Sequence, residues 1–194
     1  MDKNPLVLLE LVERLGNLMR SELRKAGSEE TLQPVHLQAL LYITKANRYS
    51  NTPQALADYL GLTKGTVSQT LLVLDRRGLI ERYQDDVDRR VVRLRLSGDG
   101  EQLLSDSQPT LAWQNATRNI SPNRIRNAVS ALREALVTLQ EDNEGTPFGV
   151  CHNCSHCQKL SQRVYRCGQM GDRLSGPETR KICWVYEPKT EEVG

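Results

Sequence analysis

Residues 52–96 read TPQALADYLGLTKGTVSQTLLVLDRRGLIERYQDDVDRRVVRLRL, and this stretch decides the fold. A short helix begins at Thr52-Pro53 and ends at Gly61. Thr63 is placed to cap a second helix over residues 64–77. Two helices joined by a short glycine turn predict a helix-turn-helix.

A charged hairpin follows the second helix directly. Gly78 stands where a residue of left-handed conformation ends a helix, and extended runs occupy residues 79–83 and 91–96. In the second run apolar residues alternate with arginines, which is the period of a strand with one buried face. Residues 84–90 form a charged loop between the two runs. A helix-turn-helix followed by such a hairpin is a winged helix.

Helical periodicity continues on both sides of this unit. Apolar residues recur at helical spacing over residues 5–26, 34–44 and 122–140. Pro109 interrupts a further helical region over residues 97–119. The predicted fold class is therefore mainly α with a small β-hairpin wing (α+β).

Charge and hydropathy limit the function classes. The 194 residues carry 26 Lys and Arg against 24 Asp and Glu, a net charge of +2, so a nucleic-acid contact must come from a local patch. No run of about 18 apolar residues occurs, which excludes a membrane-spanning helix. The N-terminal residues lack the basic start, unbroken apolar stretch and cleavage site of a signal peptide. We therefore expect a cytoplasmic protein with no membrane partner.

The second helix of the helix-turn-helix has the composition of a major-groove reader. Its apolar stripe of Val67, Leu71 and Leu74 leaves small and hydrogen-bonding side chains on the other side. Its first turn offers backbone amides to a phosphate, and arginines in the hairpin are suited to a minor groove or the DNA backbone. The predicted DNA-contacting residues are Thr63, Lys64, Thr66, Ser68, Gln69, Arg76, Arg89 and Arg90.

The sequence resembles the MarR family of bacterial transcription regulators. The likeness rests on the segments 62–68, 74–82, 88–90 and 94–100, which follow the family's recognition helix, first wing strand, wing tip and exit into the next helix. It implies that Asp88 orients Arg90 in the wing. Gln69 departs from the family, whose members frequently carry a basic residue there, so the base preference is expected to differ.

The resemblance covers residues 5–142 and implies that the first helix and the last two helices pair with a second subunit. A winged helix of about 70 residues would leave their apolar faces little to cover, which also favours an intersubunit bundle. We expect a homodimer on a double-stranded DNA operator. The predicted domains are a winged-helix and dimerisation domain over 1–142, a linker over 143–147 and a cysteine-rich tail over 148–194.

The tail holds every cysteine of the chain: Cys151, Cys154, Cys157, Cys167 and Cys183. An odd, clustered set of thiols in a reducing compartment indicates metal ligation or redox chemistry rather than structural disulfides. A segment of about 40 residues with few apolar side chains also needs a metal for stability. The spacing departs both from zinc sites with two close cysteine pairs and from the bacterial ferredoxin run.

The tail looks like one attached to a subset of MarR relatives, and its spacing is similar to that of the cluster-binding small subunits of glycyl-radical decarboxylases. These likenesses imply four metal ligands, namely Cys151, Cys154, Cys167 and Cys183. Cys157 is then a spare thiol or a substitute ligand. A 4Fe-4S cluster is favoured over zinc, with thiol redox chemistry or no metal as the remaining alternatives. His152 and His156 are alternative ligands, although a histidine in such a loop is more often solvated.

Loss or redox change of the centre is expected to alter how the tail packs on the dimer. The separation of the two recognition helices would then change, and with it the affinity for half-sites about 34 to 36 Å apart. Alternatively, an aromatic or lipophilic small molecule binds between the dimer helices and the wing domain, and the metal is structural. An enzyme such as a thiol oxidoreductase using Cys154 and Cys157 is disfavoured, because the chain lacks a phosphate-binding glycine loop and a thioredoxin-like context.

Overall fold

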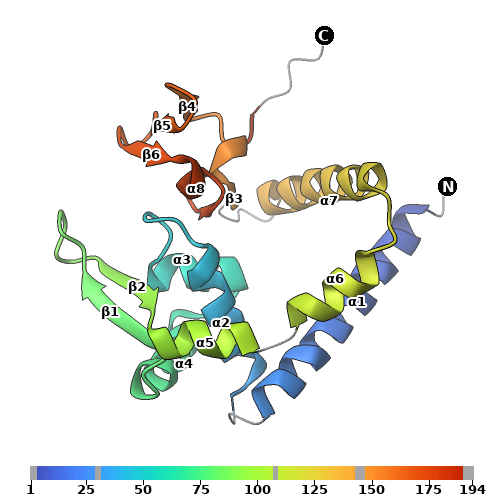
Figure 1. Cartoon of the computed structure of the whole chain (residues 1–194), viewed down its shortest axis with the longest axis horizontal. Helices are drawn as coiled ribbons and strands as arrows, with labels where there is room; N and C mark the ends of the chain where they lie inside the picture. Colours follow the sequence, from blue (N-terminus) through green and yellow to red (C-terminus); the bar gives the residue numbers. More distant parts are fainter. Residues whose placement is uncertain (1–3, 29–31, 107–108, 143–146, 190–194) are drawn as a thin grey trace.

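The structure, a computed structural model, describes residues 4–28, 32–106, 109–142 and 147–189. It consists of a winged-helix body, a limb of helices and a small β-rich tail (Figure 1). Most of the predicted linker, residues 143–146, lies outside the described residues. Within the described ranges, no helix has both the length and the apolar character needed to cross a bilayer.

Three helices form the body: α2 (Pro34–Lys45), α3 (Pro53–Leu60) and α4 (Lys64–Arg76). Thr52 caps α3 by accepting a hydrogen bond from the Ala55 N–H (3.2 Å). The turn that follows α3 contains Gly61 at φ 64°, a left-handed conformation that costs glycine little because it has no Cβ. The predicted helix-turn-helix is therefore present.

The core of the body lies between these helices and the wing. Its largest fully buried side chains are Leu37, Leu40, Tyr42, Leu56, Val67, Leu71, Leu74 and Leu94. The predicted inward face of α4 is thereby confirmed. Gly78, with φ 67°, ends α4 as the sequence predicts.

The wing is an antiparallel hairpin of β1 (Ile80–Gln84) and β2 (Val92–Leu96), with Ile80 opposite Leu96. The first strand begins one residue later than predicted. The Asn51 carbonyl, just before α3, accepts a hydrogen bond from the Leu94 N–H (2.7 Å). The loop between α2 and α3 is thus attached to the outer edge of the wing.

α5 (Gly98–Asp106) packs against α2 and β2 of the body, and the limb consists of α1 (Asn4–Ser28), α6 (Pro109–Thr117) and α7 (Pro122–Asp142). The break between α5 and α6 falls at Pro109, as expected for a residue that cannot donate a helical hydrogen bond. α1 and α6 lie side by side and project away from the body (Figure 1).

The tail contains short elements that the sequence pattern did not predict. In chain order they are β3 (Gly149–Val150), the 3-10 turn η1 (Cys151–Asn153), β4 (Cys157–Lys159), β5 (Val164–Cys167), β6 (Arg173–Ser175), α8 (Gly176–Thr179) and β7 (Ile182–Cys183). β3 pairs with β7, and β4, β5 and β6 form a second antiparallel sheet. Strands of two to four residues are too short to show a hydrophobic period.

Candidate nucleic-acid interface and cysteine centre

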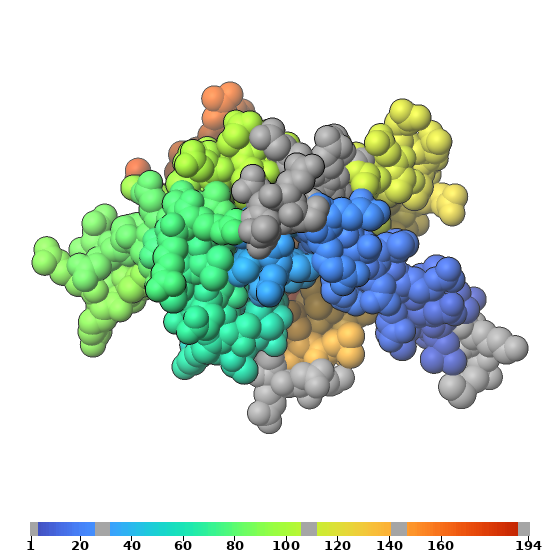
Figure 2. Space-filling view, turned by 90° about the horizontal axis from the view of Figure 1, so that it is seen from below, coloured from blue at the N-terminus to red at the C-terminus, as the bar shows by residue number. Residues whose placement is uncertain are grey.

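The first turn of α4 is held by Thr63. Its Oγ1 accepts a hydrogen bond from the Thr66 N–H (3.2 Å) and lies 3.0 Å from the Thr66 Oγ1. The predicted contact residues on this helix, from Thr63 to Gln69 and at Arg76, are all exposed. α4 and the wing occupy one face of the molecule, with the wing protruding at its edge (Figure 2).

Hydrogen bonds hold the wing tip rigid. The Arg90 Nε and Nη2 donate to the Asp88 carboxylate at 3.0 and 2.9 Å, the arrangement that the family resemblance implies. These bonds, together with one from the Arg90 N–H, hold the pKa of Asp88 below its ordinary value. The Arg90 side chain remains 91% exposed, so the pair fixes its direction without burying it.

A second carboxylate, that of Asp85, closes the turn. It accepts the Asp88 N–H (3.0 Å), the Arg93 Nε (2.7 Å) and the Val87 N–H (2.9 Å), and these bonds lower its pKa to about 2. Arg89 is exposed beside this turn and makes no ion pair with another described residue. The wing tip thus presents cations on a backbone that is already ordered.

A hollow of about 530 Å³ separates α4 from the wing. Lys64 and Ser68 line it from the helix, and Arg90 lines it from the wing. One lining residue, Trp184, comes from the tail. A tail side chain therefore reaches the surface that the sequence assigns to DNA.

The five cysteines come together in one cluster, all as free thiols. Cys151, Cys154, Cys167 and Cys183 are buried, and Cys157 is half-buried against them. The cluster contains all four predicted ligands. It also contains Cys157, which the sequence treats as spare.

Backbone pairing in the tail explains this convergence. β4 and β5 place Cys157 directly opposite Cys167, and β3 and β7 place Gly149 opposite Cys183. The backbone at Gly149 passes so close to the Tyr186 ring that a Cβ would lie 2.5 Å from it. Glycine is needed here because any side chain would push the ring away.

Hydrogen-bond donors surround two of the sulfurs. The Glu187 N–H donates to the Cys154 Sγ at 3.5 Å, and the Val185 N–H favours the thiolate of Cys183. The Asn47 Nδ2, a buried amide of the body, has no hydrogen-bond partner of full geometry among the described residues, but it faces Cys183 and also favours its thiolate. Such donors match sulfur that carries negative charge, as in a metal thiolate.

Burial disfavours the charged thiolate form of the clustered cysteines. It raises the pKa of Cys151, Cys157 and Cys183 above the ordinary value, because a thiolate loses hydration in the protein interior. Within the described ranges, no group of three or more His, Cys, Asp or Glu side chains has the arrangement that holds a metal ion. The clustered cysteines and the donors around them fit a metal thiolate centre in residue type. In the described part of the chain, the positions of the sulfur atoms do not form the geometry of a metal site.

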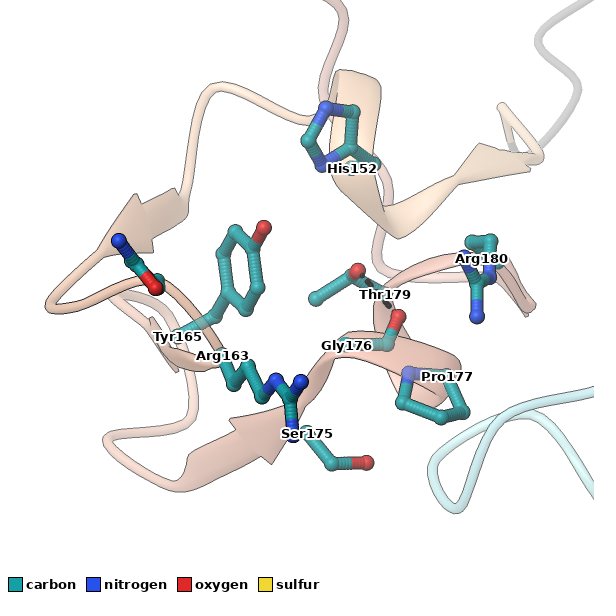
Figure 3. Close-up of a pocket in the computed structure, with 9 residues that line it drawn as sticks. His152, Arg163, Tyr165, Ser175, Gly176, Pro177, Thr179 and Arg180 are labelled. Atoms are coloured by element: carbon teal, nitrogen blue, oxygen red, sulfur yellow. Dashed lines mark hydrogen bonds between the residues drawn. The ribbon is translucent and has the colours of Figure 1, made fainter.

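Both tail histidines contact other side chains of the tail. The His156 Nε2 lies 2.6 Å from the Glu187 Oε2. His152 packs edge-on against Tyr165 and lines a hollow of about 590 Å³ together with Arg163 and Arg180 (Figure 3). Among the described residues, no cysteine lines this hollow, and Tyr165, which does line it, also packs against the cysteine cluster.

The tail is attached to the body through the loop between α2 and α3. The Asn47 N–H donates to the Ile182 carbonyl (2.9 Å), and the Trp184 N–H donates to the Ser50 Oγ (2.9 Å). At the rim, the Tyr49 hydroxyl donates to Asp172 (2.8 Å), and an ion pair joins Arg48 to the tail. The sequence predicts that the tail packs on the dimer, and the structure attaches it to the winged helix of its own chain.

Sequence reasoning missed Asn47, Ser50 and Trp184. The stretch 47–51 has the composition of an ordinary polar loop, and nothing in its pattern marks two side chains that become almost fully buried. Of these three residues, only Trp184 is marked by the sequence, because it follows directly after the predicted ligand Cys183.

A third hollow, of about 590 Å³, lies between α7, α3 and the tail. Its lining is mainly apolar: Tyr59, Val129, Leu132, Leu136, Val137, Phe148, Val150, Ile182 and Tyr186. Arg133 and Gln140 also line it, and the Gln140 Oε1 is buried without a hydrogen-bond partner among the described residues. The hollow therefore offers an apolar wall with two polar side chains in its lining.

Comparison with known proteins gives consistent matches. Residues 31–91 match the model of the MarR family. The transcriptional repressor MprA of Escherichia coli (strain K12) is 32% identical over 100 residues, which cover 52% of this chain and 52% of the repressor. The chain thus spans about half the length of the curated relatives it matches. That relative is described as a repressor, in agreement with the expectation that this chain is not an enzyme.

Solved structures share the fold. The S. aureus MepR–DNA complex aligns with a TM-score of 0.54 at 21% identity and covers 66% of this chain and 96% of that one. CouR from Rhodococcus jostii RHA1 bound to p-coumaroyl-CoA aligns at 0.56 and 20% identity, over 64% of this chain and 88% of that one. The fold, the family match over residues 31–91 and the relationship to MprA together show that the winged-helix part of this chain is similar to the MarR family of transcription regulators.

Proposed function

We propose that the protein is a DNA-binding transcription regulator that acts as a homodimer and whose operator affinity depends on a metal centre in its tail. The observation that carries the DNA-binding role is the pairing, on one face, of an exposed recognition helix with a rigid wing tip bearing Arg89 and Arg90. The DNA-bound MepR structure has the same fold and supports this reading.

Selection from a random pool of DNA duplexes tests this role. The purified chain should enrich a sequence with two half-sites separated by one helical turn, about 34 to 36 Å, because each subunit presents one recognition helix. An absence of enrichment at low salt would overturn the role, since electrostatic binding is strongest there.

Dimerisation is supported by apolar side chains on the limb. Leu6, Leu9 and Leu18 of α1 are each more than half exposed, and Leu136 and Leu139 of α7 are similar. A monomer rarely leaves so much contiguous apolar surface in water. A second copy of the chain, with the same helices, would cover it by two-fold symmetry.

The metal centre is supported by the shared burial of the predicted ligands and by the donors aimed at their sulfurs. A bound metal would neutralise the thiolate charge and cross-link segments of the tail that its short strands hold weakly. We propose a 4Fe-4S cluster as the occupant that the tail's resemblances favour, with zinc as the alternative.

Anaerobic purification followed by analysis of iron, sulfide and zinc tests the centre. Near-equal iron and sulfide that are lost in Cys151→Ser would identify a cluster. One zinc per chain, lost in the same variant, would identify a zinc site. If the folded chain contained neither iron nor zinc, the metal centre would be excluded from the proposed function.

A small-molecule effector is a second candidate for the signal, favoured by the hollow between α7 and α3. Its apolar wall suits an aromatic or lipophilic body, and Arg133 and Gln140 supply polar side chains in its lining. CouR was solved with p-coumaroyl-CoA, a ligand with an aromatic group. Release of DNA by such a compound while the metal stays bound would establish the effector as the signal.

A further inference from the structure

The loop from Asn47 to Asn51 contacts both the cysteine cluster and the wing. It leaves α2 at Ala46, which forms a bridge with Ile182 of the tail, and it ends at the cap of α3. Asn47 and Ser50 within it are 3% and 0% exposed. Buried polar side chains in a loop are costly unless they are bonded, so their partners show what the loop holds in place.

At the cluster side, Asn47 has two separate roles. Its Oδ1 accepts the N–H groups of Tyr49 and Ser50 (3.0 Å each) and the Ser50 hydroxyl (2.7 Å), which fixes the loop. Its Nδ2 is buried and has no hydrogen-bond partner among the described residues, and the bond from the Asn47 N–H to the Ile182 carbonyl (2.9 Å) places this amide next to Cys183. An amide donor left unused in the protein interior is satisfied when the sulfur beside it becomes a metal-bound thiolate.

At the wing side, Asn51 makes three side-chain bonds. Its Nδ2 donates to the Tyr83 hydroxyl and to the Leu94 carbonyl (3.1 Å each), and its Oδ1 accepts from the Arg93 Nη1 (3.3 Å). Arg93 in turn holds Asp85, the carboxylate that closes the wing tip. The loop is thus bonded to both strands of the hairpin.

Ser50 and Trp184 connect the cysteine side of the loop to the surface beside the wing. The Ser50 Oγ donates to Asn47 and accepts the Trp184 N–H. Trp184 follows Cys183 directly, packs against both hydrophobic clusters and lines the hollow between α4 and the wing. A displacement of Cys183 therefore moves a side chain at the surface assigned to DNA.

We infer that Asn47 is a positioning residue for the cysteine centre and that the loop from Asn47 to Asn51 couples the occupancy of that centre to the wing. The Asn47 amide donates to the Cys183 sulfur in the metal-bound state, and Ser50 holds Trp184 against the body. This inference rests on the proposed metal centre. The coupling then runs through a contact inside each subunit and does not require a change in the separation of the two recognition helices.

Two variants of the full chain separate the roles. Asn47→Asp retains the oxygen that fixes the loop but replaces the donor with a second, repulsive oxygen. Ser50→Ala removes the acceptor of the Trp184 N–H and leaves the Asn47 donor in place. Both should retain the winged-helix core, and the far-ultraviolet circular dichroism of each checks this.

The first measurement uses Co²⁺, whose thiolate absorption reports binding without any DNA assay. In competition with a chelator, Asn47→Asp should bind Co²⁺ about 10- to 100-fold more weakly than the wild type, the usual effect of losing a partner of a metal ligand. Ser50→Ala should bind it as the wild type does. Equal affinity in the wild type and Asn47→Asp would overturn the role of Asn47. Absence of Co²⁺ binding in the wild type would overturn the proposed metal centre itself.

The second measurement is the ratio of DNA affinities with and without bound metal, on the duplex that the wild type enriches. The wild-type ratio should differ from one by about 5-fold or more, a typical coupling between sites. In Ser50→Ala it should approach one, although the metal still binds. A Ser50→Ala ratio equal to that of the wild type would overturn the loop as the route. A wild-type ratio of one with bound metal would overturn any coupling, while the DNA-binding function would stand.

Discussion

Arg90 shows how a single side chain can be ordered and still exposed. Asp88 accepts two hydrogen bonds from its guanidinium, which fixes its direction and reduces the entropy lost on meeting a phosphate. The sequence predicted this pair from the family resemblance, and the structure confirms its geometry.

Arg90→Ala should therefore weaken binding to every DNA sequence and lower the slope of log K against log salt by about 1, because one phosphate contact is lost. Gln69→Ala should instead change preference at particular base pairs. Fluorescence anisotropy over a salt series measures both, with Arg124→Ala on α7 as the control. An unaltered salt slope in Arg90→Ala would show that Arg90 makes no phosphate contact.

Gly149 is a residue whose importance only the tertiary structure reveals. Gly149→Ala should destabilise the tail by about 1 to 3 kcal/mol, because the new methyl group must displace the Tyr186 ring beside Cys183. Urea unfolding measures the loss. Gly98→Ala is the matched control, since nothing lies within 4 Å of the added Cβ there. Equal stability of the two variants would show that the ring moves freely.

The wing is the element whose shape depends most on ionised carboxylates. The pKa of Asp85 in the fold is about 2, below its ordinary value, so its contribution to the turn is complete above the ordinary value and is lost as the pH falls through about 2. The amide resonances of Val87 and Asp88 should accordingly stay constant from pH 7 to about 4.5 and shift only in stronger acid. In Asp85→Asn this acid shift should be absent. A shift centred near pH 4 in the wild type would contradict the ordered turn.

α7 is the element through which dimerisation can be tested. Leu132→Glu and Leu136→Glu should raise the dimer dissociation constant at least tenfold each, since a charge would be buried in an apolar interface. Analytical ultracentrifugation gives the constant. Asn127→Glu, which adds the same charge at an exposed polar position, should leave it unchanged. A monomeric wild type would exclude the dimer.

At the scale of the whole molecule, the attachment of the tail depends on buried hydrogen bonds more than on charge. The Arg48–Glu178 ion pair is partly exposed and contributes at most about 1 kcal/mol. The Asn47 and Trp184 backbone bonds lie deeper in the seam.

In a Trp113→Phe background, Trp184 emission should therefore be insensitive to added salt up to about 1 M, where charges are screened beyond about 3 Å. The additional change Arg48→Ala should leave the emission wavelength unaltered. Unfolding in urea supplies the red-shifted reference. A red shift with salt alone would mean that the tail is held electrostatically.

The sequence by itself determined the winged helix and most of its boundaries. The caps at Thr52 and Thr63, the glycines that end α3 and α4, and the alternation in β2 are local signals, which neighbouring residues in the chain are sufficient to encode. It also determined which residue types gather in the tail, because cysteine spacing is visible without a fold. Only the tertiary structure placed all five thiols in one cluster, Asn47 beside Cys183 and Trp184 beside α4. These contacts join residues far apart in the chain, and no local period encodes which distant segment will bury a given side chain.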